Sequence, residues 1–469
     1  MTIQQAPQTE SGPGRTAGAR PDLNRIIAEQ EEIFVRRQPG SRELASRASR
    51  ALVGGVVSSW QITAPQPVWL SHGLGSKVYD VDGNEYIDLH GGYGAMLAGH
   101  AHPAIVEAVR ARVGRGTHFA QPTEDALLVA EELARRFGLP QWRFGNSGTE
   151  ATMDAVHLMR SITGRDMIIK VEGCYHGHHD SVQVSVMPEP DEAGPEARPA
   201  SAPASSGIPG AITRLTLVAT FNDLDSVATL LEEHPGQIAG MILEPIMMNA
   251  GIIHPDEGYL AALKDLLHRH DALLAFDEVK TGFTAGPAGA TGRYGVVPDV
   301  VAIAKALGGG VSTAAVGGTE EVMGLIVDGR YDQVGTFNGN PLGMAAAKAC
   351  MTEVLTPAAY EHLDRLEKRM ADGIQQVLDA HDLRWRVVTA GAKGCIAFRE
   401  EPIRNYRDYL EVDALLGQAH WLVQHNGGVF LPPWGKSEQW LISVQHTDED
   451  VDRFVANVER FVSLLLGEG

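Results

Sequence analysis

Cysteine, positive charge and long apolar runs are all scarce in this sequence. Among 469 residues there are 3 cysteines, Cys174, Cys350 and Cys395. They are too few and too scattered for a disulfide framework or a metal cluster, which fits a reducing compartment. Basic residues number 39 against 59 acidic ones, and the net charge of −20 argues against nucleic acid or an anionic membrane as a partner. Because no apolar stretch could span a membrane and the N-terminus lacks a signal-peptide core, we expect a soluble cytoplasmic protein.

The length and the order of patterns predict two domains. A chain of 469 residues with 44% hydrophobic residues can bury a large core. Helical and strand patterns alternate through the middle of the chain, which predicts βαβ units around a mainly parallel sheet. An amphipathic helix is expected from Leu23 to about Leu52, and a final helix over Glu449–Leu466. The predicted parts are a disordered tail (1–22), an N-terminal segment of helix and small sheet (23–100), a large domain (101–345) and a small α+β domain (346–469).

Two shorter segments have distinctive compositions. Val78–Asp88 alternates apolar and polar residues around Asp82–Gly83–Asn84, which predicts a β-hairpin. Residues 187–211 are rich in Pro, Ala, Ser and Gly and predict a long surface loop. A loop of this length is often a lid, although an insertion without a role is nearly as common.

Two predicted strands end in charged residues. Lys305 follows the apolar run 300–304, and Asp277 follows the run 272–276. A partly solvated lysine at a strand end can lose its proton near neutral pH and form a Schiff base with a carbonyl. A carboxylate there can hold a cation such as a protonated pyridine nitrogen. The pair suggests a pyridoxal-phosphate enzyme, whereas a solvated loop lysine and a helix-capping aspartate are the ordinary alternatives.

Two segments could bind phosphate. Asn146–Ala151 precedes a predicted helix, and the small residues Ser147, Gly148 and Thr149 would offer donors to an anion at the helix N-terminus. The alternative is a plain capping box, because Ser147 and Glu150 have its spacing. The turn-rich segment Gly335–Pro341 supplies Thr336 as a second phosphate contact.

A dense loop, Glu172–Asp180, contains Tyr175 and three histidines. A metal site is one interpretation, but three histidines within four residues do not converge easily on one ion. We favour stacking of Tyr175 on a planar ring, with Val279 on the opposite face, and no metal. Asn249 follows the strand-like run 238–243, which would bring it to the same edge of the sheet.

These motifs together resemble the class III pyridoxal-phosphate aminotransferases, most closely the branch of glutamate-1-semialdehyde 2,1-aminomutase. The resemblance runs from about residue 50 to the C-terminus. It implies fold type I of the pyridoxal-phosphate-dependent transferases, an α/β fold with a mainly parallel sheet in the large domain and a smaller α+β C-terminal domain. The segments that carry it, in order, are Asn146–Ala151, Gly173–Gly177, Asp277–Val279, Lys305 with Gly308–Gly310, and Gly335–Pro341.

The resemblance also implies a role for each matching residue. Lys305 would form the Schiff base and shuttle protons, Asp277 would pair with the pyridine nitrogen, and Tyr175 would stack on the ring. The active site would lie at the interface of a homodimer, with residues 187–211 at the position of a mobile gate. Pyridoxal 5'-phosphate would be held by Ser147, Gly148, Thr149, Tyr175, His176, Asn249 (at the phenolic oxygen), Asp277, Val279, Lys305 and, from the partner subunit, Thr336.

The substrate side departs from the aminomutase pattern. Gln61 stands where an arginine is expected to hold the substrate carboxylate, and a neutral amide cannot replace a bidentate charged contact. Trp60 replaces a smaller residue, and Tyr93 stands at a tryptophan position. Glu438 is a further predicted substrate residue. Lys280, at a usual methionine position, could supply the missing cation but is expected to face solvent.

These departures favour a transaminase over an aminomutase, acting on small amino and oxo compounds. The intramolecular aminomutase reaction stays as the alternative. A cofactor-binding protein without catalysis is a third possibility, which the presence of Lys305 argues against.

Overall fold

The computed structural model describes residues 22–433, 436–437 and 439–468. Residues 1–21, nearly all of the predicted tail, lie outside this range, as does the predicted substrate residue Glu438. Within the described part of the chain, no helix is both long and apolar enough to cross a membrane. The three cysteines are buried.

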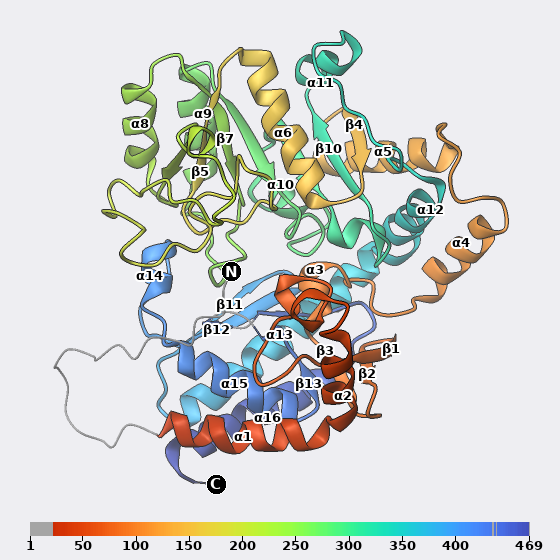
Figure 1. The fold of residues 1–469 in the computed structure, drawn as a ribbon, viewed down its shortest axis with the longest axis vertical. Coiled ribbons are helices and arrows are strands. Elements are labelled where there is room, and N and C mark those ends of the chain that lie inside the picture. The colour runs from red at the N-terminus through yellow and green to blue at the C-terminus, as the bar shows by residue number, and fades with distance from the viewer. Residues whose placement is uncertain (1–21, 434–435, 438, 469) are drawn as a thin grey trace.

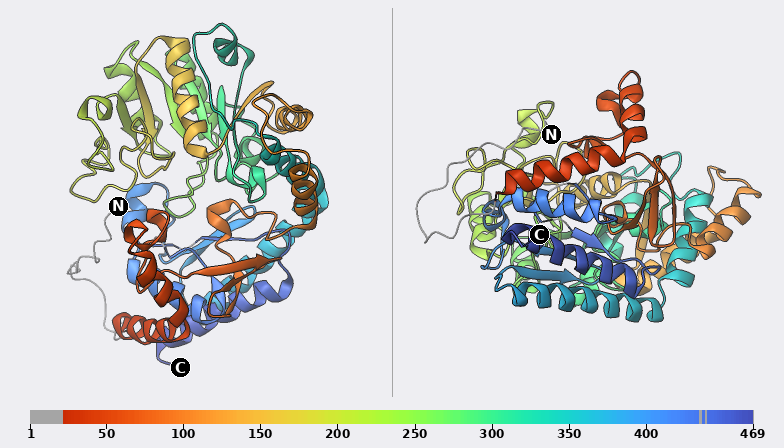
Figure 2. Two further views of the ribbon diagram at one scale, coloured as in Figure 1. Left: turned by 45° about the vertical axis from the view of Figure 1, so that its right-hand side comes forward. Right: turned by 90° about the horizontal axis from the view of Figure 1, so that it is seen from below.

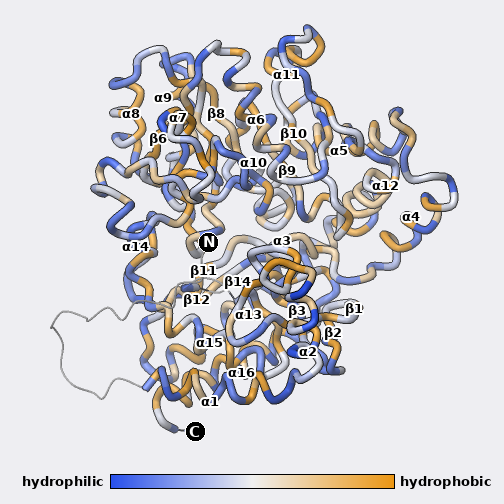
Figure 3. The backbone as a smooth tube through the Cα atoms, in the orientation of Figure 1, coloured by the Kyte–Doolittle hydropathy of each residue, from blue (hydrophilic) through white to orange (hydrophobic). Residues whose placement is uncertain are grey.

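The larger part of the molecule is built on a seven-stranded sheet with the order β4-β10-β9-β8-β7-β5-β6 (Figure 1). Strands β5 to β9 run parallel, and β10 is antiparallel to both of its neighbours. The central strands are apolar along their length, because both faces of the sheet are covered (Figure 3). The predicted mainly parallel sheet is confirmed. Its strands are β4 (Gln141–Gly145), β5 (Met167–Val171), β6 (Thr216–Ala219), β7 (Ile238–Leu243), β8 (Leu273–Asp277), β9 (Val300–Ile303) and β10 (Ala314–Gly318).

Helices cover both faces of this sheet (Figures 1 and 2). On one face α6 buries Val156 and Met159 against Ala275. On the other face, Leu263 of α9 belongs to the main core together with Phe276, which is the residue after Ala275 and points to the opposite side of β8. The helices of this part are α4 (Pro103–Val113), α5 (Glu124–Phe137), α6 (Gly148–Thr163), α8 (Leu224–Glu233), α9 (Tyr259–Arg269), α10 (Gly289–Tyr294), α11 (Glu320–Val327) and α12 (Pro341–Ala349).

The remaining residues form two small sheets and a group of helices (Figure 2). The predicted hairpin is confirmed, since Val78 of β2 pairs with Tyr86 of β3. One sheet contains β1 (Leu70–Leu74), β2 (Lys77–Asp80), β3 (Glu85–Asp88) and β13 (Val429–Phe430), and the other contains β11 (Arg386–Ala390), β12 (Lys393–Ala397) and β14 (Gln439–Leu441). The helices are α1 (Leu23–Arg37), α2 (Pro39–Ala48), α3 (Gly91–Gly94), α13 (Pro357–Ala380), α14 (Tyr406–Leu410), α15 (Ala414–Asn426) and α16 (Asp448–Leu466).

The expectation of one N-terminal helix from Leu23 to about Leu52 is wrong. The segment forms α1 and α2, which are separated at Gln38. Pro39 disfavours helical backbone at the residue before it and has no N–H to donate, so the first helix ends there and a second begins. The final helix, predicted from Glu449 to Leu466, begins one residue earlier at Asp448.

The two faces of the β11-β12-β14 sheet have different neighbours. Ile396 of β12 belongs to the core that contains Phe454 of α16. Cys395 points to the opposite face and packs with Met248 and Ala285, which come from loops of the larger part. The face of β12 that carries Lys393 and Cys395 is therefore directed toward the carboxyl ends of the large sheet.

The loop predicted over residues 187–211 contains no helix or strand before α7 (Gly210–Thr213). Its first half is attached to α14. The Tyr406 hydroxyl donates to the carbonyl of Pro188 at 3.0 Å, and the Arg407 guanidinium donates to the carbonyl of Ala193 at 2.7 Å. Arg407 also forms a bidentate ion pair with Glu172 at 2.7 and 2.8 Å.

Candidate active site

A cavity of about 380 Å³ opens at the carboxyl ends of β7, β8 and β9 and at the N-terminus of α6. Its volume lies within the range of small-molecule pockets, about 300–1,000 Å³. Parallel strands end at one edge of the sheet, which is where open α/β folds place ligands. The described lining residues are Trp60, Ala95, Asn146, Ser147, Gly148, Thr149, Tyr175, His176, Gly177, Glu244, Asn249, Asp277, Val279, Lys280, Ala304, Lys305, Gly310, Val311, Ser312 and Thr313.

The N-terminus of α6 forms one end of the cavity. Ser147 and Glu150 make a capping box there: Ser147 Oγ accepts from the Glu150 N–H at 3.3 Å, and the Glu150 carboxylate accepts from the Ser147 N–H at 2.9 Å. A Cβ at Gly148 would lie only 2.8 Å from the side chain of Val279, so the cradle needs glycine. The capping box and the anion site are therefore compatible, because the helix N-terminus faces the cavity and favours negative charge.

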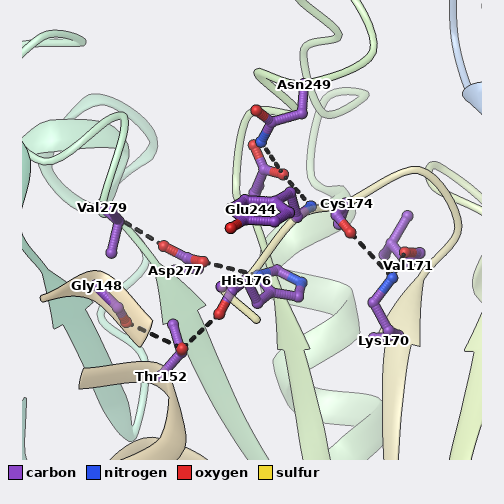
Figure 4. A network of polar contacts seen from close by, with 12 residues as sticks. Gly148, Thr152, Lys170, Val171, Cys174, His176, Glu244, Asn249, Asp277 and Val279 are labelled. Atoms are coloured by element: carbon purple, nitrogen blue, oxygen red, sulfur yellow. Dashed lines mark hydrogen bonds and ion pairs between the residues drawn. The ribbon is translucent and has the colours of Figure 1, made fainter. Parts of the chain in front are cut away.

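Asp277 lies at the end of β8 and is only 4% exposed. Its Oδ2 accepts from His176 Nδ1 at 2.8 Å, and its Oδ1 accepts from the Val279 N–H at 2.9 Å (Figure 4). The His176 carbonyl in turn accepts from the Thr152 hydroxyl at 2.5 Å. These contacts fix the orientation of a buried carboxylate that can hold a cation in the cavity.

Tyr175 and Val279 both line the cavity, as expected for residues that flank a planar ring. The rings of Tyr175 and Trp60 meet in a T-shaped arrangement, with a centroid distance of 5.4 Å and an angle of 84° between their planes. Burial, followed by the charge of Asp277, raises the pKa of the Tyr175 hydroxyl. Tyr175 therefore stays protonated and acts here as a flat, mainly apolar surface.

Glu244 is a site residue that the sequence analysis does not single out. It is 2% exposed and accepts three hydrogen bonds: from the N–H groups of Tyr175 (2.9 Å) and Met248 (2.8 Å), and from Asn249 Nδ2 (2.8 Å). The signal was present, because Glu244 follows β7 as Asp277 ends β8. Glu244 holds Tyr175 and Asn249 in place, and its contact with Asn249 is shown in Figure 4.

Lys305 is in contact with the cavity and adopts a left-handed backbone conformation, with φ of 50°. This region is rarely used by residues other than glycine. Burial lowers the pKa of the Lys305 amine, and the charges of Asp277 and Glu244 oppose that shift. A lowered pKa is what a nucleophilic amine requires.

The expectation that Lys280 faces solvent is wrong. Its side chain is half-buried and lines the cavity. The Lys280 ammonium donates to the carbonyl of Met248 at 2.7 Å and to Asn249 Oδ1 at 2.9 Å. The loop after β7 provides both acceptors and so turns the lysine inward.

Several predicted residues are not at the cavity of the described chain. Gln61 is exposed, and its side-chain oxygen accepts from the Val57 N–H at 3.1 Å instead of pointing inward. Tyr93 lies beside Trp60, with ring centroids 5.7 Å apart, and is not among the described lining residues. Thr336 is exposed and likewise absent from the described lining. No described residue of the loop 187–211 lines the cavity either, so its role as a lid stays a prediction.

The cavity fits pyridoxal phosphate. It joins an anion-binding helix N-terminus at Gly148, an oriented carboxylate at Asp277, the flat Tyr175 and an amine at Lys305, which match a ring bearing a phosphate, a basic nitrogen and an aldehyde. Residues 61–461 match the protein-family model described as Aminotransferase class-III. The chain belongs to this family. As a class III aminotransferase it is an enzyme, and its cofactor is pyridoxal phosphate.

Individual relatives of this class III chain fall into two groups. It is 37% identical over 435 residues to glutamate-1-semialdehyde 2,1-aminomutase 2 of Geobacillus kaustophilus, covering 91% of this chain and 99% of the relative. Among solved structures it is similar to an omega-transaminase from Sphaerobacter thermophilus, with a TM-score of 0.87, 32% identity and coverage of 92% and 100%. A glutamate-1-semialdehyde aminomutase variant from Pseudomonas aeruginosa, solved in complex with PMP, has a TM-score of 0.86, 30% identity and coverage of 94% and 98%. The overall likeness thus fits both transaminase and aminomutase.

Proposed function

We propose that this enzyme is a transaminase, which releases an oxo product and then aminates a second substrate. The carrying observation is the absence of arginine from the described residues that line the cavity. Gln61, at the position expected for the carboxylate-binding arginine, is turned back toward Val57. An aminomutase must retain its intermediate while the amino group moves to the neighbouring carbon, and this cavity lacks the bidentate contact that would hold it.

The residues around the cavity suggest how the reaction is divided among them. When bound, pyridoxal phosphate supplies an electron sink for negative charge at the substrate carbon. The donors at Ser147 and Thr149 bind its phosphate, and Asp277, oriented by His176, pairs with its ring nitrogen. Lys305, whose pKa burial lowers, takes and returns the proton at the carbon that carries the amino group.

An aromatic wall favours substrates with an apolar part. Trp60 lines the cavity and contacts the rings of both Tyr93 and Tyr175. Trp60 and Tyr175 offer a surface to an apolar or aromatic substituent, and Tyr93 packs against Trp60.

The deciding experiment supplies glutamate 1-semialdehyde without any oxo acid and measures 5-aminolevulinate. We expect no efficient conversion. In parallel, a panel of amino donors is tested with pyruvate or 2-oxoglutarate, and at least one donor should be converted. Efficient formation of 5-aminolevulinate without an added oxo acid would overturn the transaminase assignment in favour of the aminomutase.

We also propose that the enzyme is a homodimer in which Thr336 binds the cofactor phosphate of the partner subunit. Thr336 is exposed next to Phe337 and Val334, whose exposed fractions of 58% and 76% are high for apolar residues. Asn338 in the same segment accepts from Asn146 Nδ2 at 3.1 Å, beside the phosphate end of the cavity. The segment therefore lies at the edge of the site without entering it.

Subunit mixing tests this arrangement. Lys305→Ala and Thr336→Ala subunits are refolded together. If Thr336 acts across the interface, each heterodimer regains one site with both native residues, and cofactor affinity and activity at that site return to wild-type values. If the mixture shows only the average of the two parent proteins, Thr336 does not act on the partner's site.

A further inference from the structure

Lys393 is a buried lysine for which the described part of the chain offers no hydrogen-bond or ion-pair partner. It lies in β12 and is 2% exposed. Another buried lysine shows what is missing: the ammonium of Lys170 donates to the carbonyls of Val171 and Cys174, each at 3.0 Å. A buried amine without such partners has lost its hydrogen bonds to water with no replacement, so Lys393 needs an explanation.

The direction of the Lys393 side chain follows from the sheet. It shares a face of β12 with Cys395, and that face packs against Met248 and Ala285. Met248 precedes Asn249, whose side chain lines the cavity. Lys393 therefore points from the small sheet toward the cavity and away from the helices behind it.

The nearest charged groups on that side are also basic. The charges of Lys280 and Lys305 both act on Lys393, and those of Lys393 and Lys280 act on His90. The packing around Gly94 also shows that Lys280 and Lys305 both lie against α3. A Cβ at Gly94 of α3 would lie 3.8 Å from Lys280 and 3.7 Å from Lys305.

The β-ladder brings Lys393 to the same helix. Gly91, at the other end of α3, has Leu441 against its Cα, and Leu441 is the direct cross-strand neighbour of Lys393. Lys393 thus lies beneath α3, close to the lysines that line the cavity.

Lys393 is not among the described residues that line the cavity, and it lies next to the substrate side of the cavity wall. The phosphate end is at Gly148, and the ring nitrogen is expected at Asp277. Lys280 and Lys393 lie toward the small sheet, where two basic groups meet and the expected arginine is missing. A bound anion would provide Lys393 with the counter-ion that the described protein residues do not provide.

We propose that Lys393, together with Lys280, forms a subsite for the carboxylate of the amino donor or the oxo acceptor. This inference rests on the proposed transaminase function. Lysine acts as a point charge, so the subsite accepts a carboxylate in more than one orientation, unlike a bidentate arginine. A dual-substrate enzyme benefits from that tolerance, because two different carboxylates must use one pocket in turn.

Proton uptake should accompany carboxylate binding. Burial, then the charges of Lys280 and Lys305, lower the pKa of Lys393 well below its ordinary value, and only Cys395 opposes them. Among the described residues, His90 also interacts with the charge of Lys393; burial lowers the pKa of His90 to about 4, opposed by the charge of Asp88, so His90 is neutral. A bound carboxylate favours the ammonium form and raises this pKa, so the neutral fraction of the amine takes a proton from solvent as the ion pair forms.

The test compares two ligands that differ in charge, 3-phenylpropionate and 3-phenylpropan-1-ol, on the holoenzyme by calorimetry in two buffers of different ionisation enthalpy. The wild-type enzyme should prefer the carboxylate and take up protons with it. Lys393→Met should weaken carboxylate binding by about 10- to 100-fold and abolish the uptake, because a charged hydrogen bond is lost. Alcohol binding should change by less than about twofold, and Lys393→Arg should restore carboxylate binding.

Each contrary result has a distinct meaning. The proposal applies to a Lys393→Met variant with native cofactor absorbance and a native urea midpoint. If that variant loses equal affinity for both ligands, or loses no affinity for the carboxylate, the subsite is refuted. If Lys393→Met does not fold, the wild-type measurement still decides, since no preference for the carboxylate or no proton uptake rejects the proposal.

Steady-state kinetics then show which carboxylate is bound. Lys393→Met should raise KM for the donor, the acceptor or both when they carry a carboxylate, and by a larger factor than for an amine donor and an aldehyde acceptor. If the wild-type enzyme transfers no amino group between any pair, the transaminase function fails, whereas the calorimetric comparison remains readable.

Discussion

Replacing Glu244 by glutamine should change both the stability of the enzyme and the proton affinity of Lys305. The carboxylate accepts from the N–H groups of Tyr175 and Met248 and from the side chain of Asn249. Glutamine has one side-chain oxygen, which can keep the two donors on Oε1. Its amide nitrogen would then face the Met248 N–H, donor against donor.

The expected loss of stability follows from these contacts. A buried N–H left without an acceptor costs about 1–3 kcal/mol, and the two retained bonds lose the share that a charged acceptor adds. We expect the free energy of unfolding to fall by about 2–4 kcal/mol, measured by urea denaturation. The second effect is electrostatic: Glu244 is one of two carboxylates that oppose the lowering of the Lys305 pKa by burial. Its removal should lower that pKa further.

A labelling experiment measures the second effect without relying on activity. The cofactor is removed, the protein is pulsed with acetic anhydride over a range of pH, and acetylation of Lys305 is quantified by mass spectrometry. The midpoint should move to lower pH in Glu244→Gln. Glu278→Gln is the matched control, because Glu278 is also buried and accepts from the hydroxyls of Thr281 and Thr291 and from two N–H groups. Its charge is not among those acting on Lys305.

The two variants should lose comparable stability, and only Glu244→Gln should shift the Lys305 midpoint. An unchanged midpoint in Glu244→Gln, or an equal shift in Glu278→Gln, would refute the argument that Glu244 tunes the reactive lysine.

Three further predictions concern stability and its pH dependence. Lys305→Gly should be more stable than Lys305→Ala by about 1 kcal/mol in urea denaturation, because glycine tolerates the φ of 50° at this position. Lys393→Met should remove a rise of stability with pH. In the unfolded chain the lysine holds its proton up to about pH 10.4, whereas in the folded protein the buried amine releases it at lower pH. Between these two pKa values the free energy of unfolding of the wild-type protein should rise by up to about 1.4 kcal/mol per pH unit, and that of the variant should not. Arg407→Met leaves Glu172 buried without its ion pair and should cost about 3–5 kcal/mol at neutral pH. Since burial already raises the pKa of Glu172 and the loss of Arg407 raises it further, the deficit should shrink as the pH falls toward the ordinary value of about 4.3, and Glu172→Gln in the same background should remove this pH dependence.

The strand ends were predictable because the signal is local. Asp277 and Lys305 follow short apolar runs, and those runs form the parallel strands β8 and β9. Ser147 and Glu150 have the spacing of a capping box and form one. By contrast, the break between α1 and α2 was missed although Pro39 marks it, because the charge and apolar spacing continue across the break.

The contacts between distant segments were not predictable. His176 orients Asp277 from 101 residues away, and Glu244 joins Tyr175 to Asn249. Which way a side chain points is also undecided by its neighbours in sequence. Gln61 was placed at the substrate by alignment of motifs, yet it turns to Val57 in its own segment.

The sequence by itself determined the family and the cofactor, and all the residues that it predicts for the cofactor end except Thr336 line one cavity, because that chemistry needs particular residue types in short motifs at strand and helix ends. The tertiary structure decided how the substrate end is arranged. Lys280 turns inward because a loop from β7 provides its acceptors, and Lys393 is brought beneath α3 by the pairing of β12 with β14 and the packing of Leu441 against Gly91. A short motif carries its own geometry, whereas the surroundings of a lone lysine depend on segments that meet only after folding.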